Sequence, residues 1–514
     1  MTTFDKFKLT AEQEAILGAK EKLVAITAYA GTGKTSTLRA FAESHPKEKT
    51  LYLAFNKSLA EESKIAFSSC PNVLVKTIHS LAYGSIGHKY SRTLGEIRPY
   101  ALMPYINEYK IHSQEIKYFL AKEVNECLQD FFMSASPSLE AFLKSRKRKI
   151  KVKLEGAGKR AKDMTSLVSK VWKDSVDGKF TMPHNGYLKL FQMEPGGKLD
   201  QYDRILVDEA QDLNDCMISL VTGARAKQIF VGDPYQQIYG FNGAVNALSK
   251  KYLRGSAVYY LTQSFRCPNS VAELANKYLT LLDAPKPFSG VAKPNAEGGV
   301  PGNLLIARTN AGLFDFVAKN AQAKRFAYNG GFAGYQFEMI LDLVNLINDK
   351  RHLVKDAFLK QFPTIEALEL YANQANDSAA NTRIRIAKKY KEDAFAIYNQ
   401  MLKNIADESE ADYIATTAHK IKGREYKNVI LLDDFINLYD MCKMGATIEA
   451  ILDKTGSLPI EFQCVVNLEE IRLIYMAMTR SKHNLAIPPQ YKLTKALIDD
   501  FQRLVFRNCL LLMD

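Results

Sequence analysis

A glycine-rich segment followed by a lysine and a threonine carries the strongest chemical signal in the chain. It reads Ala28-Tyr-Ala-Gly-Thr-Gly-Lys-Thr35 and follows a short apolar run, Leu23–Thr27, which predicts a buried strand. Glycines let successive N–H groups turn inward around phosphate oxygens where a helix begins. Lys34 would reach the β- and γ-phosphates, and the Thr35 hydroxyl would bind Mg²⁺. We therefore expect a triphosphate site, although Ala28 stands where the general pattern has glycine; the alternative is a glycine turn with a chance lysine.

A pair of carboxylates at the end of another apolar run supplies the expected partner of this site. The run Ile205–Val207 predicts a buried parallel strand, and Asp208 and Glu209 follow it directly. Asp208 would bind Mg²⁺ through water, and Glu209 would orient and deprotonate an attacking water molecule. Two adjacent acids are also common at a solvated strand end. The glycine-rich segment favours the catalytic interpretation.

The elements that must position these groups alternate between strand and helix. A helix is expected from Lys34 to Glu43, and further strands are expected at 50–54, 73–75, 204–207, 228–231, 258–261, 413–416 and 429–432. The two stretches between these groups of strands are mainly helical. Alternating strands and helices predict an α/β fold with parallel sheets. We expect one domain at residues 1–84 and 202–258 with a basic helical insertion at 85–201, and a second at 259–334 and 408–514 with a small helical insertion at 335–407.

The charge of the chain favours a polyanionic partner. Its 514 residues include 69 Lys and Arg against 56 Asp and Glu, which gives a net charge of +13. Such an excess attracts phosphates and releases their counterions. The most basic segment, Lys144–Lys162, holds ten Lys and Arg and one Glu. It predicts a surface that follows a phosphate backbone, and a solvated loop is the alternative.

Cysteine spacing and hydropathy point to an intracellular protein. The seven cysteines lie far apart, with no zinc-ligand or C-x-x-C spacing, so we expect reduced thiols and no structural metal. The first residues lack the apolar core of a secretory signal, and no apolar run is long enough to span a bilayer. We expect a soluble, cytoplasmic protein from a bacterium, phage or plasmid, or a nuclear one if the source is eukaryotic.

The sequence Asp208-Glu-Ala-Gln-Asp212, following the A-x-x-G-x-G-K-T segment, resembles the UvrD/Rep helicases of superfamily 1. Other segments resemble the remaining motifs of that family, in its order, from Leu9 to Arg480. The resemblance implies two RecA-like motor domains that use ATP and Mg²⁺. It also implies a set of nucleotide-binding and catalytic residues: Gln13 for adenine, Ala28, Gly31, Thr32, Gly33, Lys34, Thr35 and Ser36 in the phosphate loop, Thr35 and Asp208 for the metal, Glu209 and Gln236 at the γ-phosphate, Phe265 stacking on adenine, Arg266 and Arg480 as charge-stabilising arginines, and Glu425 on ribose.

The same resemblance implies contacts with single-stranded DNA. The residues that match the family's DNA-contacting motifs are Phe55, Asn56, Lys57, Thr77, His79, Tyr239, Phe241 and His419. From the sequence alone, Phe55, Tyr239 and Phe241 could instead be core residues, since an aromatic beside a strand is usually buried. As stacking platforms, each would contribute about 1–3 kcal/mol per base. His79 could equally satisfy a turn.

Departures from the family pattern refine this resemblance. Phe241 stands where tryptophan is commoner, which keeps an aromatic face. Pro234-Tyr235 and Asn56-Lys57 are more similar to the F-box DNA helicase branch, although the chain opens directly on the glutamine motif and we expect no F-box. The second insertion is shorter than in UvrD, where this element contacts duplex, so strand separation is the weakest expectation.

The resemblance implies an ATP-dependent helicase or translocase that moves 3′→5′ on single-stranded DNA. It would separate strands or remove bound proteins, with single strands and single/double-strand junctions as partners. An ATP-switched nucleic-acid-binding protein with little unwinding activity is the alternative. A small-molecule P-loop kinase would need neither stacking aromatics nor two α/β halves.

Overall fold

The computed structural model describes residues 9–109, 111, 114–146, 151–152, 162–163, 165–194, 198–240, 243–249, 251–292, 300–320, 322–374, 378–440, 442 and 468–511. The chain divides into two compact units. The first comprises Met1–Ala28 and Gly33–Leu261, and the second comprises Tyr29–Thr32 and Thr262–Asp514. Each unit is described in turn.

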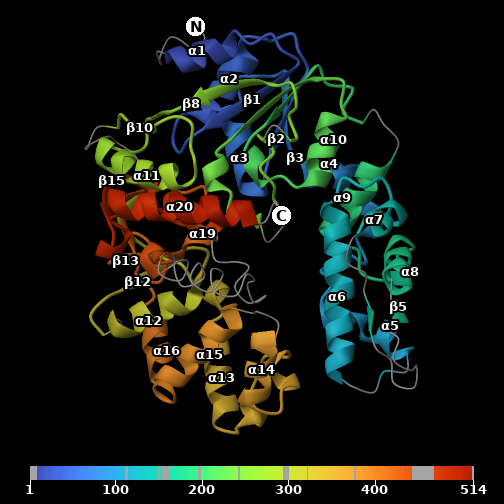
Figure 1. Cartoon of the computed structure of the whole chain (residues 1–514), viewed down its shortest axis with the longest axis vertical. Helices are drawn as coiled ribbons and strands as arrows, with labels where there is room; N and C mark the ends of the chain where they lie inside the picture. Colours follow the sequence, from blue (N-terminus) through green and yellow to red (C-terminus); the bar gives the residue numbers. More distant parts are fainter. Residues whose placement is uncertain are drawn as a thin grey trace. The chain divides into compact units, whose positions relative to one another are not determined.

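The first unit is built on a six-stranded parallel sheet (Figure 1). In sheet order its strands are β3 (Val73–Thr77), β2 (Thr50–Ala54), β6 (Arg204–Val207), β7 (Lys227–Gly232), β1 (Leu23–Ala28) and β8 (Ala257–Leu261). Because the strands are parallel, their carboxyl ends all lie at one edge, which is where side chains from separate motifs can meet. β8 pairs with β1, so the chain leaves this sheet at Leu261, a few residues later than the expected boundary at 258.

Helices cover both faces of this sheet. The helices of its α/β part are α1 (Ala11–Leu17), α2 (Lys34–Glu43), α3 (Lys57–Ala66), α4 (Ile78–Ser85) and α10 (Asp215–Thr222). Side chains alternate along β2: Leu51 and Leu53 belong to the core shared with α4 and α10, whereas Tyr52 and Ala54 belong to the core shared with α2 and α3. Parallel strands buried on both faces explain the apolar runs in the sequence.

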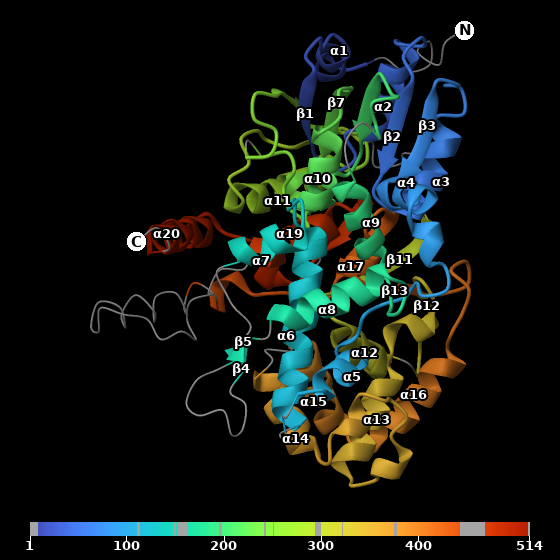
Figure 2. The same ribbon diagram turned by 90° about the vertical axis from the view of Figure 1, so that its right-hand side faces the viewer.

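The insertion in the first unit is a helical subdomain that shares the larger of these two cores. Its helices are α5 (Met103–Asn107), α6 (Gln114–Met133), α7 (Leu139–Ser145), α8 (Thr165–Val176) and α9 (His184–Met193), with a short antiparallel pair, β4 (Lys151–Val152) and β5 (Lys162–Asp163). Leu120, Val124 and Leu128 recur every four residues on α6 and are fully buried. The long helix α6 packs against α8 and α9 (Figures 1 and 2).

The second unit contains a five-stranded parallel sheet. In sheet order its strands are β12 (Phe326–Tyr328), β13 (Tyr413–Thr417), β11 (Val300–Ala307), β14 (Tyr426–Leu431) and β15 (Ser481–Ala486). A small parallel pair joins β9 (Gln263–Ser264) to β10 (Ser289–Gly290). The helices around these strands are α11 (Asn269–Leu281), α12 (Asn310–Asn320), α17 (Ala418–Ile421), α19 (Leu468–Met478) and α20 (Lys495–Leu511).

A second helical insertion follows β12. It consists of α13 (Glu338–Ile347), α14 (Ile365–Gln374), α15 (Ser378–Tyr390) and α16 (Asp393–Lys403), which lie together in Figure 2. The predicted α/β fold, with two parallel sheets that each carry a mainly helical insertion, is confirmed, and both sheets are RecA-like. Across the part of the chain that the structure describes, no helix combines the length and the apolar character that a membrane crossing requires.

Candidate nucleotide and nucleic-acid site

The glycine-rich segment lies between β1 and α2, as the sequence predicts. Gly33 precedes α2 with φ 80° and ψ 35°, a left-handed conformation that glycine adopts without strain, and Lys34 is the first helical residue. Ala28, which replaces the usual glycine, is fully buried at the end of β1, while Ser36 is exposed. The four residues Tyr29–Thr32 group with the second unit. Among them Gly31 has φ 69°, and the Thr32 hydroxyl donates to the Tyr29 carbonyl.

Lys34, Thr35, Asp208 and Glu209 converge at the carboxyl edge of the first sheet. Lys34 Nζ lies 3.5 Å from Glu209 Oε1, and Thr35 Oγ1 donates to Asp208 Oδ2 at 3.2 Å. Asp208 is 1% exposed, and its Oδ1 accepts the Glu209 N–H at 2.8 Å. Glu209 has φ 52°, which is rare for a residue with a side chain and occurs where surrounding structure enforces it. The two sequence segments therefore form one site.

The electrostatics of this site suit a divalent cation. Burial, with the adjacent Glu209 carboxylate, raises the pKa of Asp208, and the Lys34 ammonium opposes that rise. The Thr35 hydroxyl and the Asp208 carboxylate are hard oxygen donors of the kind Mg²⁺ prefers. These two residues thus fit the predicted metal, which would relieve the cost of a buried negative charge.

Gln13 lies against the first turns of α2. Its side chain is 5% exposed, its Nε2 donates to Thr37 Oγ1 at 3.0 Å, and its Oε1 accepts the Thr10 N–H at 3.0 Å. Thr10 and Gln13 form a capping box at the start of α1. The T-x-x-Q spacing predicts this cap, which was not among the residues predicted above. The adenine contact of Gln13 stays a prediction.

A chain of hydrogen bonds leads from Glu209 to Gln236. Gln211 Nε2 donates to Glu209 Oε2 at 2.5 Å, and Gln211 Oε1 accepts the Asp233 N–H at 3.0 Å. Gln236 Nε2 then donates to Asp233 Oδ2 at 2.9 Å. A side chain at Gly232 would place its Cβ 2.2 Å from Gln211 Oε1, so only glycine fits beside this bridge. Gln211 and Asp233 thus connect two motifs that lie more than twenty residues apart in the sequence.

Two of the predicted stacking residues lie against each other. The rings of Phe55, which follows β2, and Tyr239, which follows β7, stack with centroids 5.8 Å apart and an interplanar angle of 16°. Both residues are partly exposed, so neither is an ordinary core residue. Phe241 lies outside the described residues. Asn56 caps α3 by accepting the Leu59 N–H at 2.9 Å, and Lys57 is exposed at the start of that helix.

The predicted contacts Thr77 and His79 lie at the start of α4. Thr77 is the N-cap in a capping box with Ser80. His79 Nε2 lies 3.0 Å from Asn185 Oδ1 of α9, and burial lowers the pKa of His79, so its ring is neutral at pH 7. Asn185 was not predicted; it comes from the helical insertion, and no local spacing relates it to His79.

In the second unit, the predicted nucleotide residues form a charged cluster. Arg266 Nε lies 2.7 Å from Glu425 Oε2, and Lys482 Nζ lies 3.7 Å from the same oxygen. Burial opposes ionisation of Glu425, but Arg266 and Lys482 outweigh it and lower the pKa of Glu425. Arg480 is 2% exposed, and its Nε donates to the Met476 carbonyl at 3.0 Å.

This cluster also holds the segment Tyr29–Thr32. The Phe265 N–H donates to the Gly31 carbonyl at 2.9 Å, and Ser264 Oγ donates to the Ala30 carbonyl at 2.8 Å. A Cβ on Gly31 would lie 2.3 Å from that of Arg266, so the close approach requires glycine. The Phe265 ring is 49% exposed, as a base-stacking platform needs to be. His419 lies partly exposed in α17.

Comparison with known proteins relates these motifs to a family. A family model described as an AAA domain matches residues 12–242. F-box DNA helicase 1 of Gallus gallus is 32% identical over 94% of this chain and 49% of its own length. F-box DNA helicase protein 1 of Schizosaccharomyces pombe is 28% identical over 93% of this chain and 57% of its own length. These matches support a superfamily 1 helicase related to the UvrD/Rep type.

The two relatives also bear on the finer resemblance. Pro234-Tyr235 and Asn56-Lys57 predict a similarity to the F-box DNA helicase branch. The two relatives confirm this similarity. The chain spans about half the length of the relatives that it matches. A probable DNA helicase II homolog of Mycoplasma genitalium is 35% identical, over only 16% of the chain.

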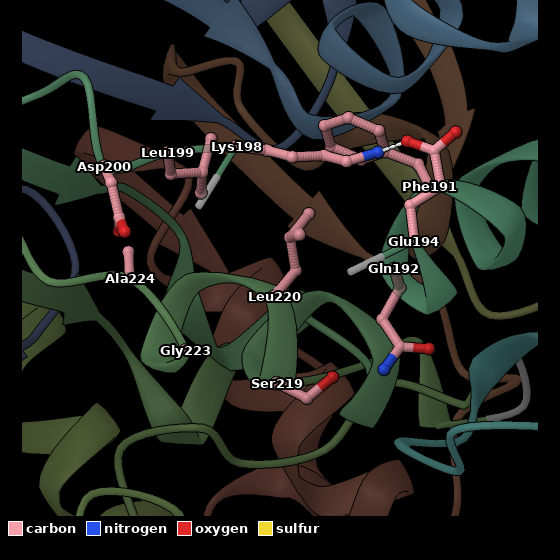
Figure 3. Close-up of a pocket in the computed structure, with 10 residues that line it drawn as sticks. All are labelled: Phe191, Gln192, Glu194, Lys198, Leu199, Asp200, Ser219, Leu220, Gly223 and Ala224. Atoms are coloured by element: carbon pink, nitrogen blue, oxygen red, sulfur yellow. Dashed lines mark ion pairs between the residues drawn. The ribbon is translucent and has the colours of Figure 1, made fainter. Parts of the chain in front are cut away.

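A cavity elsewhere in the first unit is lined by none of the predicted site residues. It has a volume of about 130 Å³ and lies between α9, the turn at 198–200 and α10 (Figure 3). Its lining residues are Phe191, Gln192, Glu194, Lys198, Leu199, Asp200, Ser219, Leu220, Gly223 and Ala224. Lys198 pairs with Glu194 and its Nζ lies over the Phe191 ring, 4.4 Å from the centroid, so the charge inside the cavity is already matched.

Proposed function

We propose that this chain is an ATP-dependent DNA helicase or translocase that moves 3′→5′ on single-stranded DNA. It would act on single strands and single/double-strand junctions, where it separates strands or removes bound proteins. One observation carries the proposal. The hydrogen-bonded chain from Glu209 through Gln211 and Asp233 to Gln236 runs from the hydrolytic acid toward the loop that holds Tyr239.

The residues of the first unit divide the work of hydrolysis among them. Lys34 holds the β- and γ-phosphates at the start of α2, where helix N–H groups also point toward the phosphates. Thr35 and Asp208 would hold Mg²⁺, which when bound neutralises phosphate charge. Glu209 orients the attacking water and accepts its proton. The Lys34 ammonium lies 3.5 Å from the Glu209 carboxylate, so the two charges balance each other.

Arginines of the second unit complete the proposed chemistry. Arg266 and Arg480 would stabilise the charge that develops on the transferring phosphoryl group. The ion pair of Arg266 with Glu425 holds the guanidinium in one orientation. Phe265, with its exposed ring, would stack on adenine.

Coupling to DNA follows from the hydrogen-bonded chain. Gln236 lies only three residues before Tyr239, and Gln237 Nε2 donates to the Ala244 carbonyl at 2.9 Å across the intervening loop. A movement of Gln236 when the γ-phosphate is lost must therefore move this loop. Tyr239 stacks on Phe55, so the same movement reaches the proposed base platform.

An ATPase assay with and without single-stranded DNA tests this function. We expect turnover that rises several-fold with DNA. Lys34→Ala should abolish turnover in both conditions while single-stranded DNA is still bound. Slow turnover that ignores DNA would instead support an ATP-switched binding protein, and near-normal turnover in Lys34→Ala would contradict the site itself.

The source of the two relatives bears on location. The relatives from Gallus gallus and Schizosaccharomyces pombe are eukaryotic proteins, which supports the nuclear alternative over a bacterial, phage or plasmid one. Imaging of the tagged full chain in its own cells tests this assignment.

A further inference from the structure

Tyr52 lies in the middle of β2, on the face of the first sheet that carries the predicted metal-binding carboxylate. In the parallel register of β2 and β6, Tyr52 lies opposite Leu206, and both side chains belong to the core under α2 and α3. Asp208 follows Leu206 by two residues, and side chains two apart share a face. The register therefore places the phenol beside the carboxylate, although no motif of the family resemblance includes Tyr52.

Every oxygen of the Asp208 carboxylate has a donor. The Tyr52 hydroxyl donates to Oδ2 at 2.5 Å, and the Thr35 hydroxyl donates to the same oxygen at 3.2 Å. The Glu209 N–H donates to Oδ1 at 2.8 Å. Ser63 Oγ, from α3, donates to the Tyr52 oxygen at 3.2 Å, which leaves the phenol proton for Asp208.

The phenol oxygen has little freedom to move. Tyr52 is fully buried and Ser63 is 1% exposed. The Tyr52 ring packs against the ring of Phe67, with centroids 4.7 Å apart. A rigid donor on a carboxylate fixes the direction of its remaining lone pairs, which is how outer partners orient metal ligands.

We propose that Tyr52 is a positioning residue that orients Asp208 for the divalent cation of the nucleotide complex. The inference rests on the proposed function, because it assumes that Asp208 holds that cation. Without the phenol, Asp208 Oδ2 keeps only the Thr35 hydroxyl, and the carboxylate can turn away from the cation. A purely structural role for Tyr52, in which a buried hydroxyl takes the nearest acceptor, is the competing explanation.

The test is Tyr52→Phe, which keeps the ring and removes only the hydroxyl. Mn²⁺ binding in the presence of ADP is measured from the decrease in the electron paramagnetic resonance signal of free Mn²⁺. This assay measures cation binding without requiring turnover. We expect the affinity for Mn²⁺ to fall about tenfold, the lower end of the range for such outer partners. ADP affinity measured in EDTA should not change. The Mg²⁺ concentration that half-saturates ATPase should rise by a similar factor.

Tyr278→Phe is the matched control. The Tyr278 phenol is also fully buried, and it donates to the Tyr491 carbonyl at 2.9 Å in the second unit. Tyr278→Phe should lower thermal stability without changing Mn²⁺ affinity. Ser63→Ala, which removes one hydrogen bond from the Tyr52 oxygen, should weaken Mn²⁺ binding less than Tyr52→Phe.

Unchanged Mn²⁺ affinity in Tyr52→Phe overturns the proposal, whether or not the variant is less stable. If Tyr52→Phe does not fold, unchanged affinity in Ser63→Ala overturns it instead. Neither result touches the proposed function, which depends on DNA-stimulated turnover of the wild type and its loss in Lys34→Ala.

Discussion

The ring of Phe55 lies nearly parallel to the ring of Tyr239, with 5.8 Å between the centroids and 16° between the planes. Phe55 comes from the end of β2 and Tyr239 from the loop after β7, and β6 separates these two strands in the sheet. A half-exposed aromatic pair at the carboxyl edge presents a flat apolar surface on which a base can stack. Tyr239 follows Gln236 by three residues in the chain, so the proposed coupling route would reach this pair.

Phe55→Ala and Tyr239→Ala should each weaken single-stranded DNA binding and its stimulation of ATPase. Loss of one stacking contact costs about 1–3 kcal/mol, or roughly 5- to 150-fold in affinity. The double variant should lose less than the sum, because each ring supports the other. Fluorescence anisotropy with a labelled oligonucleotide measures the affinity. Tyr100→Ala, which removes an exposed aromatic of the insertion, is the control, and equal losses in that variant would contradict the assignment.

Glu209→Gln should bind ATP and turn it over at least about a hundredfold more slowly. Glutamine keeps the shape of the side chain but cannot accept the proton of the attacking water, a contribution of about 10²–10⁴ in rate. A filter assay with labelled ATP should show nucleotide retained on the protein, and single-turnover kinetics gives the rate. Turnover near the wild-type rate would show that another group acts as the base.

Neutralising Lys147, Arg148 and Lys149 together should weaken DNA binding for all sequences alike. These residues lie outside the described part of the chain, so the prediction rests on the charge of the segment. Three lost phosphate contacts should make the plot of log affinity against log salt shallower by about 2 to 3. Unwinding should suffer more than DNA-stimulated ATPase if this surface holds duplex. An unchanged slope would support the alternative that this segment is a solvated loop.

Arg146→Gln alone is the control for that experiment. Its guanidinium lies 3.5 Å from Asp130 Oδ2, so it already has a partner within the chain. We expect Arg146→Gln to change the slope of log affinity against log salt by less than one third of the change in the triple variant.

Lys189 should make the stability of the chain depend on pH in alkaline solution. It is fully buried on α9, and its Nζ donates to the carbonyls of Ser134 and Ser136. Burial lowers the pKa of Lys189 from 10.5 to about 8. Between these two values the unfolded chain binds more protons than the folded one, so the stability contributed by Lys189 rises with pH across this window and is lost as pH falls toward 8.

Lys189→Met removes this titration. Urea unfolding between pH 7 and 10.5 should show the wild type gaining about 1–3 kcal/mol relative to the variant as pH rises. The loss of donors to the two carbonyls adds an offset that does not depend on pH. Parallel profiles for the two proteins would contradict the lowered pKa.

Local patterns in the sequence were enough to predict the elements that carry the phosphate site. The strand Arg204–Val207 and the helix Lys34–Glu43 occur with the predicted bounds, because each combines an apolar pattern with clear end signals. β11 and β15 were not among the predicted strands. The apolar run in β11 is short, Leu304–Ala307, and the start of the strand contains Pro301 and Gly302, which are unfavourable in a strand. The edge strand β15 is polar and alternately exposed, so it has no apolar run that marks it.

Contacts between motifs could be predicted only where a general rule brings them together. Lys34 and Asp208 meet because the carboxyl ends of parallel strands share an edge. The bonds from Tyr52 to Asp208 and from Gln211 to Asp233 depend on the strand order β2-β6-β7. Alternation of strands and helices does not determine that order, so these residues were missed.

The direction of translocation is predicted from the way that the nucleotide end of the coupling route, at Gln236, and its DNA end, at Tyr239, could work together as a ratchet. In the UvrD/Rep type, aromatic pockets alternately hold bases as the ATP site cycles, and travel is 3′→5′. This chain keeps Gln236 in the hydrogen-bonded chain from Glu209, and Tyr239 three residues further on. We therefore predict 3′→5′ translocation. Phe241→Ala, by its place in the same loop sequence, should keep basal ATPase and lose DNA stimulation and movement.

Streptavidin displacement from a biotinylated single strand reads the direction without requiring duplex unwinding. A 3′→5′ motor pushes streptavidin from the 5′ end, so release should be fast from a 5′ biotin and slow from a 3′ biotin. Lys34→Ala, which cannot turn over ATP, gives the spontaneous release rate. Displacement only from the 3′ end would contradict the polarity. Full DNA stimulation in Phe241→Ala would show that the coupling runs through some other residue.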